Sequence, residues 1–196
     1  MKYILSLLIF VLSFGLNAQK EFKIGMNLGG NLSQVSGDNL AGFHKLGINS
    51  GLFVTQSLKD DLSWEMQLNF AQRGSRNTSL KDNPTFYRFQ LNYADVVLLV
   101  RKPIKFLEVD AGLNIGSLVG FKEENYIGNQ NDPRTIGRFD FGATMGVTYK
   151  LNEKLAFTGR FINSIWRIRK HVSGATYRWN LGQYNTAVGA QLRYSF

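Results

Sequence analysis

The feature that constrains this chain most is a two-residue alternation of apolar and polar side chains, repeated in segment after segment. In the stretch FDFGATMGVTY, residues 139–149, every odd position is apolar and every even position is small, polar or charged. A period of two is typical of β-strands, whereas helical spacing would spread the polar groups around the whole cylinder. The pattern predicts strands in eight segments, 22–28, 46–55, 62–71, 87–101, 107–116, 139–149, 155–168 and 187–196.

The connections between these segments alternate in length. The long ones, rich in Gly, Asn, Ser and charge, are 35–43, 75–86, 123–137 and 170–182. The tight turns are 59–61, 102–104 and 152–153. This rhythm predicts an up-and-down meander of antiparallel strands, with all long loops at one end and both termini at the other. Barrels of the outer membrane have long extracellular loops and short periplasmic turns, so we expect periplasmic termini.

The face that points outward decides between two kinds of barrel. In a soluble barrel of lipocalin type, the apolar face surrounds an internal ligand. Here the apolar positions carry bulky side chains such as Trp64, Phe141 and Phe161, which would overfill a narrow interior. The opposite positions hold glycines and ionised groups that can pair there, and the segments suit the ~9–11 residues of a tilted spanning strand. The sequence therefore predicts an all-β protein, an eight-stranded antiparallel up-and-down transmembrane β-barrel.

Aromatic side chains cluster near both ends of the predicted strands, as expected for two interfacial belts. On the turn side these are Phe22, Trp64, Phe106, Tyr149 and Tyr194. On the loop side they are Phe70, Tyr87, Phe121, Phe139 and Tyr184.

The first residues predict a secretory signal peptide. Lys2 precedes an apolar run from Tyr3 to Leu16, which is shorter than the ~20 residues that a spanning helix needs. We assign 1–18 to the signal peptide and 19–196 to one outer-membrane β-barrel domain. The chain has no cysteine, which excludes a lipid anchor on an N-terminal Cys, and no later apolar stretch is long enough for a membrane helix.

The chain ends on NTAVGAQLRYSF, without a polar tail. In a closed barrel the last strand pairs with the first, which would place Phe196 against lipid. Tyr194 and Phe196, at alternate positions, resemble the C-terminal signal that the barrel insertion machinery reads in outer-membrane proteins. We therefore expect that machinery as a partner during assembly.

Four stretches together carry a family resemblance: the leader ending NAQ, the first strand FKIGMNLGGNLS, the central LNYADVVLLVRKP and the terminal GAQLRYSF. With them the mature chain resembles the outer-membrane β-barrel domain family of Bacteroidota, described as porin-like or PorT-like. The resemblance implies an integral protein of the outer membrane, whereas a role in protein secretion belongs to only some relatives. The eight-strand size also resembles barrels of the OmpX and OmpA type.

Ionised side chains at the inward positions predict a charge network inside the barrel. Its members are Lys23, Glu65, Arg73, Asp95, Glu108, Asp110, Asp140, Lys150, Arg160 and Arg193. Unpaired charges in a narrow lumen are costly, so these groups should pair. Eight strands leave room only for side chains, which favours a structural polar core over a gated ion path.

The formal net charge is +9, falling to about +8 once Lys2 leaves with the leader. Basic residues gather near the expected extracellular rim, at Arg167, Arg169, Lys170 and Arg178. They could bind lipopolysaccharide phosphates through charge-assisted hydrogen bonds, or they could be solvated charges at the base of a loop. Outer-membrane lipid and lipopolysaccharide are therefore expected partners.

Little in the sequence points to catalysis or to a cofactor. His44 and His171 fall near the loop side, and His44 with Ser173 is a pair that a lipid A-modifying barrel enzyme could use, but no spacing supports it. Two His and no Cys make no metal motif. NLGGN at 27–31 has no following helix and is no phosphate loop. We expect a non-enzymatic protein without cofactor, metal or nucleic-acid partner.

The fourth segment contains a conflict. Its first half places large apolar residues at odd positions from Tyr87 to Tyr93. If that parity continued with the apolar side outward, Asp95 would face lipid well inside the hydrocarbon. One extra residue in the strand, a β-bulge, would repair the conflict. We expect a bulge between Tyr93 and Val96, with Asp95 pointing into the lumen.

Two classes of function stay open. One is a structural or interaction barrel that displays extracellular loops to surface proteins. The other is a small porin-like channel or an accessory protein of outer-membrane protein secretion. Conductance in a planar bilayer separates them, because discrete openings favour a channel.

Overall fold

The computed structural model describes residues 22–38, 40, 42–58, 61–77, 83–130, 136–170 and 181–196. In these ranges the chain forms the strands β1 Phe22–Ser36, β2 Lys45–Ser57, β3 Ser63–Arg76, β4 Tyr87–Ile104, β5 Leu107–Asn125, β6 Gly128–Asn129, β7 Phe139–Lys150, β8 Leu155–Ser164 and β9 Tyr184–Ser195. The described chain holds no helix of the length and apolarity required to traverse a membrane. The predicted leader, 1–18, lies outside the described residues and stays a prediction.

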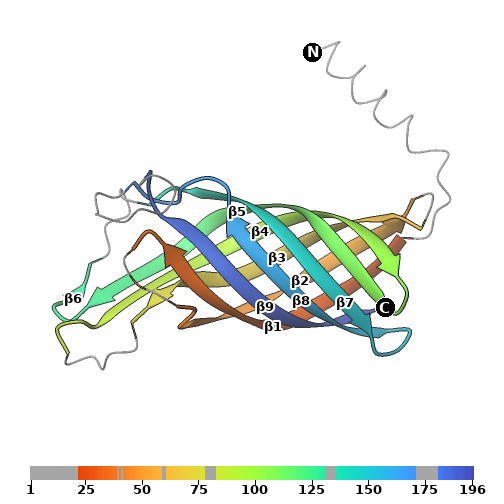
Figure 1. The fold of residues 1–196 in the computed structure, drawn as a ribbon, viewed down its shortest axis with the longest axis horizontal. Helices are drawn as coiled ribbons and strands as arrows, with labels where there is room; N and C mark the ends of the chain where they lie inside the picture. Colours follow the sequence, from red (N-terminus) through yellow and green to blue (C-terminus); the bar gives the residue numbers. More distant parts are fainter. Residues whose placement is uncertain are drawn as a thin grey trace, which may run out of the picture.

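The strands pair antiparallel and the sheet closes on itself (Figure 1). Eight strands form the wall in the order β4-β3-β2-β1-β9-β8-β7-β5, and β4 pairs with β5. The first and last strands pair from Gly25↔Ser195 to Ser36↔Tyr184, and the amide of Phe196 donates to Ile24 O at 3.0 Å. The predicted eight-stranded antiparallel up-and-down barrel is therefore confirmed, and the chain end is hydrogen-bonded to β1.

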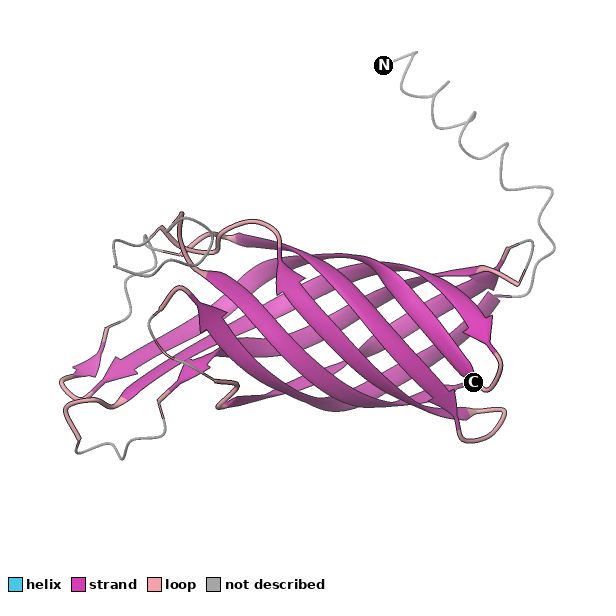
Figure 2. Ribbon diagram, viewed as in Figure 1, coloured by secondary structure: helices cyan, strands magenta, loops and turns pink. Residues whose placement is uncertain are grey.

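Short turns and the C-terminus lie at one end of the barrel, which we call the turn side, and the opposite end is the loop side (Figure 2). One turn differs from its prediction. β4 continues to Ile104, so the reversal falls at Lys105 and Phe106 rather than at 102–104. Lys105 has a left-handed φ of 55°, a conformation that a two-residue hairpin requires.

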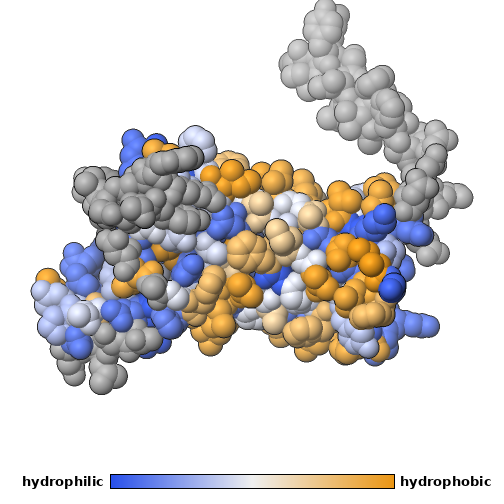
Figure 3. All heavy atoms as spheres, in the orientation of Figure 1, coloured by the Kyte–Doolittle hydropathy of each residue, from blue (hydrophilic) through white to orange (hydrophobic). Residues whose placement is uncertain are grey.

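The outer wall of the barrel is apolar. Figure 3 shows apolar residues gathered over the barrel and hydrophilic ones at its protruding end. The outward side chains of Met26, Leu28, Leu52 and Met145, for example, are 47–65% exposed. An apolar surface this extensive, running around a closed sheet, is the lipid-facing band of a membrane barrel.

Inward positions are buried and mostly polar, and small residues make room for large ones. A Cβ on Gly116 would lie 2.5 Å from Asp95 Oδ1, and one on Gly146 would lie 2.7 Å from Asp110 Oδ1. Glycine at these two positions therefore lets the opposing carboxylates turn inward. The interior is packed by side chains, as expected for eight strands.

β4 and β5, with 18 and 19 residues, are the longest strands and extend beyond the barrel as a ribbon, with β6 at its tip (Figure 1). The outward positions of β4 change from Val96 and Leu98 to polar Asn92 and Gln90 toward the tip. We call the part of β4 beyond Ala94, with the residues paired to it, the emergent half, and the part below the lipid-embedded half.

The predicted bulge in β4 is wrong. β4 pairs with β3 without a register shift from Ser63↔Arg101 to Arg76↔Arg88, and its odd residues face inward throughout. Asp95 points into the lumen without a bulge, because the apolar residues from 87 to 93 also point inward. The register shift lies on the other side, where Asn92 pairs with Gly120 and Tyr93 with Leu118, so that the extra residue is in β5.

The loop-side aromatic belt is correspondingly thinner than predicted. Phe70 and Phe139 are exposed, at 41% and 48%, whereas Tyr184 is buried. Tyr87 and Phe121 pack against the buried interior cluster. These side chains leave the outer wall because water, rather than lipid, surrounds the emergent half.

Candidate functional site: the filled barrel interior

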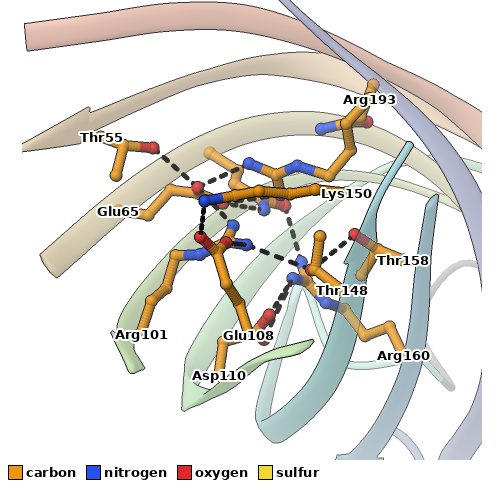
Figure 4. A network of polar contacts seen from close by, with 12 residues as sticks. Thr55, Glu65, Arg101, Glu108, Asp110, Thr148, Lys150, Thr158, Arg160 and Arg193 are labelled. Carbon is orange, nitrogen blue, oxygen red and sulfur yellow. Dashed lines mark hydrogen bonds and ion pairs between the residues drawn. The ribbon is translucent and has the colours of Figure 1, made fainter. Parts of the chain in front are cut away.

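Glu65 is the centre of a buried ion network on the turn side of the interior (Figure 4). Arg193 binds its carboxylate with two hydrogen bonds of 2.9 and 2.6 Å, and Arg101 donates to Oε2 at 2.6 Å. Thr55 and Gln67 donate at 2.7 and 2.6 Å. One carboxylate thus neutralises part of the charge of two guanidinium groups, and its lone pairs are well satisfied.

The network continues toward the turn-side mouth through Arg101. This side chain also donates to Glu108 at 2.8 Å and to Thr148 at 3.1 Å. Glu108 in turn pairs with Lys150 at 2.5 Å, and the side chain of Lys150 is 64% exposed. A chain of ion pairs therefore runs from the buried Glu65 through Arg101 and Glu108 to the exposed Lys150.

Toward the middle of the barrel, Arg160 of β8 contacts side chains of β3 and β5 inside the lumen. Its guanidinium donates to Gln67 at 2.9 Å and to Asp110 at 3.1 Å. Gln67 also accepts a hydrogen bond from Asn69 at 2.9 Å, so the ion network is followed by hydrogen-bonded amide side chains. The contacts join β3, β5 and β8 and cross-brace the wall.

A second ion cluster lies nearer the loop side, around the fully buried Arg73. Arg73 pairs with Asp95 and with Asp140, the latter at 3.2 Å, and its guanidinium lies 5.3 Å from the Tyr93 ring centroid. Ser164 donates to Asp140 at 2.6 Å. The cluster spans the lumen from β3 to β8.

An apolar cluster, which we call the cap cluster, lies beside Arg73 and extends from it toward the loop side. Its buried members are Val35, Phe89, Leu91, Tyr93, Ile136 and Ile168. Ile136 and Ile168 come from the segments that follow β6 and β8, and an isolated bridge joins Ile136 to Arg169. The cap cluster is a small apolar core at the level where the outward side chains of β4 become polar.

An ion pair fastens the cap to the emergent ribbon. Arg169 donates to both carboxylate oxygens of Glu123, at 3.1 and 2.5 Å, and its guanidinium lies 4.6 Å from the Phe89 ring centroid. Tyr87 donates to Glu123 at 2.7 Å. Burial opposes ionisation of Glu123, but the hydrogen bonds from Arg169 and Tyr87 outweigh it and hold the pKa of Glu123 below its usual value.

A large cavity opens on the turn side, with a volume of about 1170 Å³. Its lining includes Glu65, Arg101, Glu108 and Arg193 together with Phe53. The cavity therefore ends at the Glu65 network, and the Arg73 and cap clusters lie between that network and the loop side.

The structure places the predicted interior charges at three depths. Buried are Glu65, Arg73, Asp95, Asp110, Asp140, Arg160 and Arg193. Glu108 is half-buried at the mouth. Lys150 and Lys23 are exposed there, because both lie at strand ends where the lumen meets water.

Arg101, which connects the two carboxylates of the turn-side network, was not among the predicted interior charges. Its signal was available: Val96, Leu98 and Val100 point outward, so the next residue must point inward. The turn predicted at 102–104 had placed Arg101 at the very end of its strand, where inward orientation carries less weight.

The predicted basic rim divides into residues with different partners. Arg169 is committed to Glu123, whereas Arg167 donates to Leu181 O at 3.1 Å. Lys170 is exposed. Arg178 lies outside the described residues.

The structure adds no support for catalysis at the histidines and serine considered from the sequence. His44 is exposed, and His171 and Ser173 lie outside the described residues. Among the residues that the structure describes, no group of three or more His, Asp or Glu could hold a metal ion.

At the other end, Tyr194 and Phe196 lie on the outer wall, 37% and 71% exposed, with their rings edge-to-face at 5.7 Å. This placement is what a lipid-facing terminal signal requires.

A sequence comparison with protein families matches residues 17–168 to the outer membrane protein beta-barrel domain family. The match covers well over half of the chain, so the chain belongs to this family, and it is an outer-membrane β-barrel protein. A comparison with curated proteins finds no match.

Solved structures share the fold at low identity. Ail of Yersinia pestis, in complex with the heparin analogue sucrose octasulfate, is 12% identical, with a TM-score of 0.51 over 90% of this chain and 99% of that chain. Neisserial surface protein A (NspA) is 11% identical, with a TM-score of 0.46 over 91% of this chain and 100% of that one. The Ail likeness supports the barrel fold and nothing finer.

Proposed function

We propose that this protein is a non-enzymatic structural or interaction barrel, closed to ions, that displays its loop side outside the cell. Its strands cross the outer membrane, and both termini lie in the periplasm. The observation that carries the proposal is that three groups of buried side chains lie in the lumen between the turn-side cavity and the loop side: the Glu65 network, the Arg73 cluster and the cap cluster.

Planar-bilayer recording of the purified, folded protein tests the closed interior. The wild type is expected to give no discrete openings at moderate voltage. The double variant Leu91→Gly/Phe89→Gly removes two side chains of the cap cluster and serves as the positive control. Its conductance should rise if the cap cluster blocks ions at the loop side. Discrete, reproducible openings of the wild type would contradict the proposal.

Orientation is tested separately by single cysteines, because the chain has none of its own. Asn129→Cys lies at the exposed tip of the ribbon and Glu153→Cys in an exposed turn. An impermeant thiol reagent on whole cells should label the first and spare the second. After the outer membrane is permeabilised, both should react. Labelling only of Glu153→Cys on intact cells would reverse the topology.

A small channel is the second candidate, and the turn-side cavity of about 1170 Å³ favours it. The cavity carries charges of both signs and would form the periplasmic half of a pore. The buried Arg73 and the apolar cap above it argue against a continuous path. The recording described above decides between the two.

The proposed partners follow from position. Outer-membrane lipid contacts the apolar wall, and lipopolysaccharide is the proposed ligand of cations on the loop side, including Arg167 and Lys170. The barrel insertion machinery is the proposed reader of Tyr194 and Phe196 during assembly. Surface or secretion-system proteins are the proposed partners of the displayed ribbon.

A further inference from the structure

Among the described residues, a group of cations on and beside the emergent ribbon has no carboxylate paired with most of its members. Arg76 of β3 lies directly opposite Arg88 of β4, and like charges in this position destabilise a sheet. Lys122 of β5 lies opposite Gln90, one step away on the same face. We call Arg76, Arg88 and Lys122, with Lys45 behind them, the ribbon basic patch.

Lys45 is the buried member of the patch, with 4% of its surface exposed. Its ammonium donates to Leu46 O at 2.7 Å, and the charges of Arg88 and Arg76 repel it. Burial of an ammonium is costly without an opposite charge. A bound anion would reduce the repulsion among these three cations and would therefore be stabilised here.

The carboxylates nearby have other partners. Glu124, which lies opposite Arg88, pairs with Lys122 at 2.7 Å. Glu123 is held by Arg169 and Tyr87. Arg88 itself donates to the neutral Gln90 at 3.2 Å. Among the described residues, no ion pair joins Lys45, Arg76 or Arg88 to a carboxylate.

The height of the patch indicates which anion can reach it. The outer wall of β4 is apolar up to Ala94 and polar from Asn92, so Arg88 lies about six residues beyond the last lipid-facing position. At ~3.3 Å per residue and ~40° tilt, this is about 15 Å above the hydrocarbon boundary. Headgroups occupy the first ~5–8 Å there, and long Arg side chains can reach down toward them.

We propose that the ribbon basic patch binds a phosphate group, through Arg76 and Arg88 in particular. Arginine supplies forked donors that match phosphate oxygens, and Lys45 adds charge from behind. The phosphate can be carried by an outer-leaflet glycolipid or be free in solution. The lipid source rests on the proposed orientation, but the phosphate site itself does not.

Binding is measured with the full-length mature protein, folded in a neutral detergent. One probe is diphosphorylated lipid A, read by native mass spectrometry beside the same lipid with its phosphates removed. The other is inorganic phosphate, read by calorimetry. The double variant Arg76→Gln/Arg88→Gln should weaken binding of the phosphorylated probe at least tenfold.

The matched control is Lys102→Gln/Lys154→Gln, which removes the same charge from exposed positions on the turn side and should change binding less than twofold. Loss for the lipid probe alone assigns a lipid-borne phosphate, and loss for both probes assigns a site that free phosphate also fills. Equal losses in the two double variants, or no phosphate-dependent binding by the wild type, would overturn the proposal.

Thermal unfolding distinguishes a binding role from a structural one. Without phosphate, Arg76→Gln/Arg88→Gln should unfold at the same temperature as the wild type or higher, because the like-charge contact is removed. With phosphate, only the wild type and the control variant should gain stability. A clear loss of stability without phosphate would show that the arginines hold the ribbon together instead.

Because these readouts are made in detergent, they do not depend on which side of the membrane the ribbon occupies or on conductance. A failed phosphate experiment therefore leaves the closed-barrel proposal standing, and a conducting barrel leaves the phosphate site standing.

Discussion

The lipid-embedded and emergent halves of β4 have the same backbone geometry and opposite chemistry. In the lipid-embedded half, Val96 and Leu98 point outward and Asp95 inward. In the emergent half, Leu91 points inward and Gln90 outward. The parity of the strand does not change between them. What changes is the medium outside the wall, from lipid to water, and with it the side on which apolar groups are stable.

This difference separates two kinds of core within one barrel. Where lipid surrounds the wall, ion pairs such as Glu65 with Arg193 fill the lumen. Where water surrounds it, the apolar cap cluster fills the lumen, as in a soluble protein. Each half is expected to respond differently to the same type of substitution.

The largest difference is expected for removal of a carboxylate. Glu65→Ala leaves the buried Arg193 without its carboxylate and Arg101 with Glu108 alone, and it should lower the free energy of unfolding by about 3–5 kcal/mol. Glu123→Ala in the emergent half should cost less, because Glu123 and Arg169 are each 12% exposed, against 0% for Glu65, and Arg169 can turn toward water. Reversible urea unfolding in lipid vesicles gives both values. Equal costs would mean that the two networks have similar surroundings.

The next difference is expected for removal of a leucine side chain. Leu91 is fully buried in the cap cluster, so Leu91→Ala should cost about 3 kcal/mol through lost contacts and a cavity. Leu98→Ala, at a position 51% exposed to lipid, should cost about 1 kcal/mol because lipid chains fill the space. The same unfolding assay measures both. A larger cost for Leu98→Ala would reverse the assigned faces.

Introduction of a charge on the outer wall should show the two media directly. Met145 is 59% exposed in the middle of β7, and Met145→Arg should cost about 2–4 kcal/mol at the bilayer midplane. Ile127 is 71% exposed at the ribbon tip, and Ile127→Arg should change stability by about 0.5 kcal/mol or less. Similar penalties at the two sites would place both in one medium.

The smallest effect is a local one on pH. Because the folded-state pKa of Glu123 lies below its ordinary value of 4.5, its contribution is present above that value and is lost as the pH falls through the lower folded pKa. Hydrogen exchange in 165–169 should therefore accelerate below about pH 4.5 in the wild type, relative to Glu123→Gln at each pH. The same acceleration in the Glu123→Gln variant would exclude Glu123 as its cause.

Much of the barrel could be predicted because the bilayer imposes a simple rule on the residues within it. Alternation in 139–149 located β7 and its lipid face, and the terminal strand β9 pairs with β1 as closure requires. The interior position of Asp95 was also predictable, since a carboxylate is disfavoured in hydrocarbon.

The emergent half could not be predicted by the same rule. Tyr87 and Phe89 were assigned to the lipid face because the sequence does not mark where the bilayer ends. The supposed bulge then followed from applying one medium to the whole strand. The cap cluster was missed for a second reason: Ile136 and Ile168 lie in segments with no strand pattern, and only their packing brings them over the lumen.

The most direct test of the change of medium is a nitroxide scan along β4 in lipid vesicles. Single cysteines at positions 88–100 carry the label, and collision with oxygen is compared with collision with a water-soluble nickel chelate. Labels at Val96 and Leu98 should favour oxygen, labels at Gln90 and Arg88 should favour nickel, and labels at Phe89 and Leu91 should be shielded from both. Oxygen-accessible, lipid-exposed labels at Phe89 and Leu91 would contradict the account.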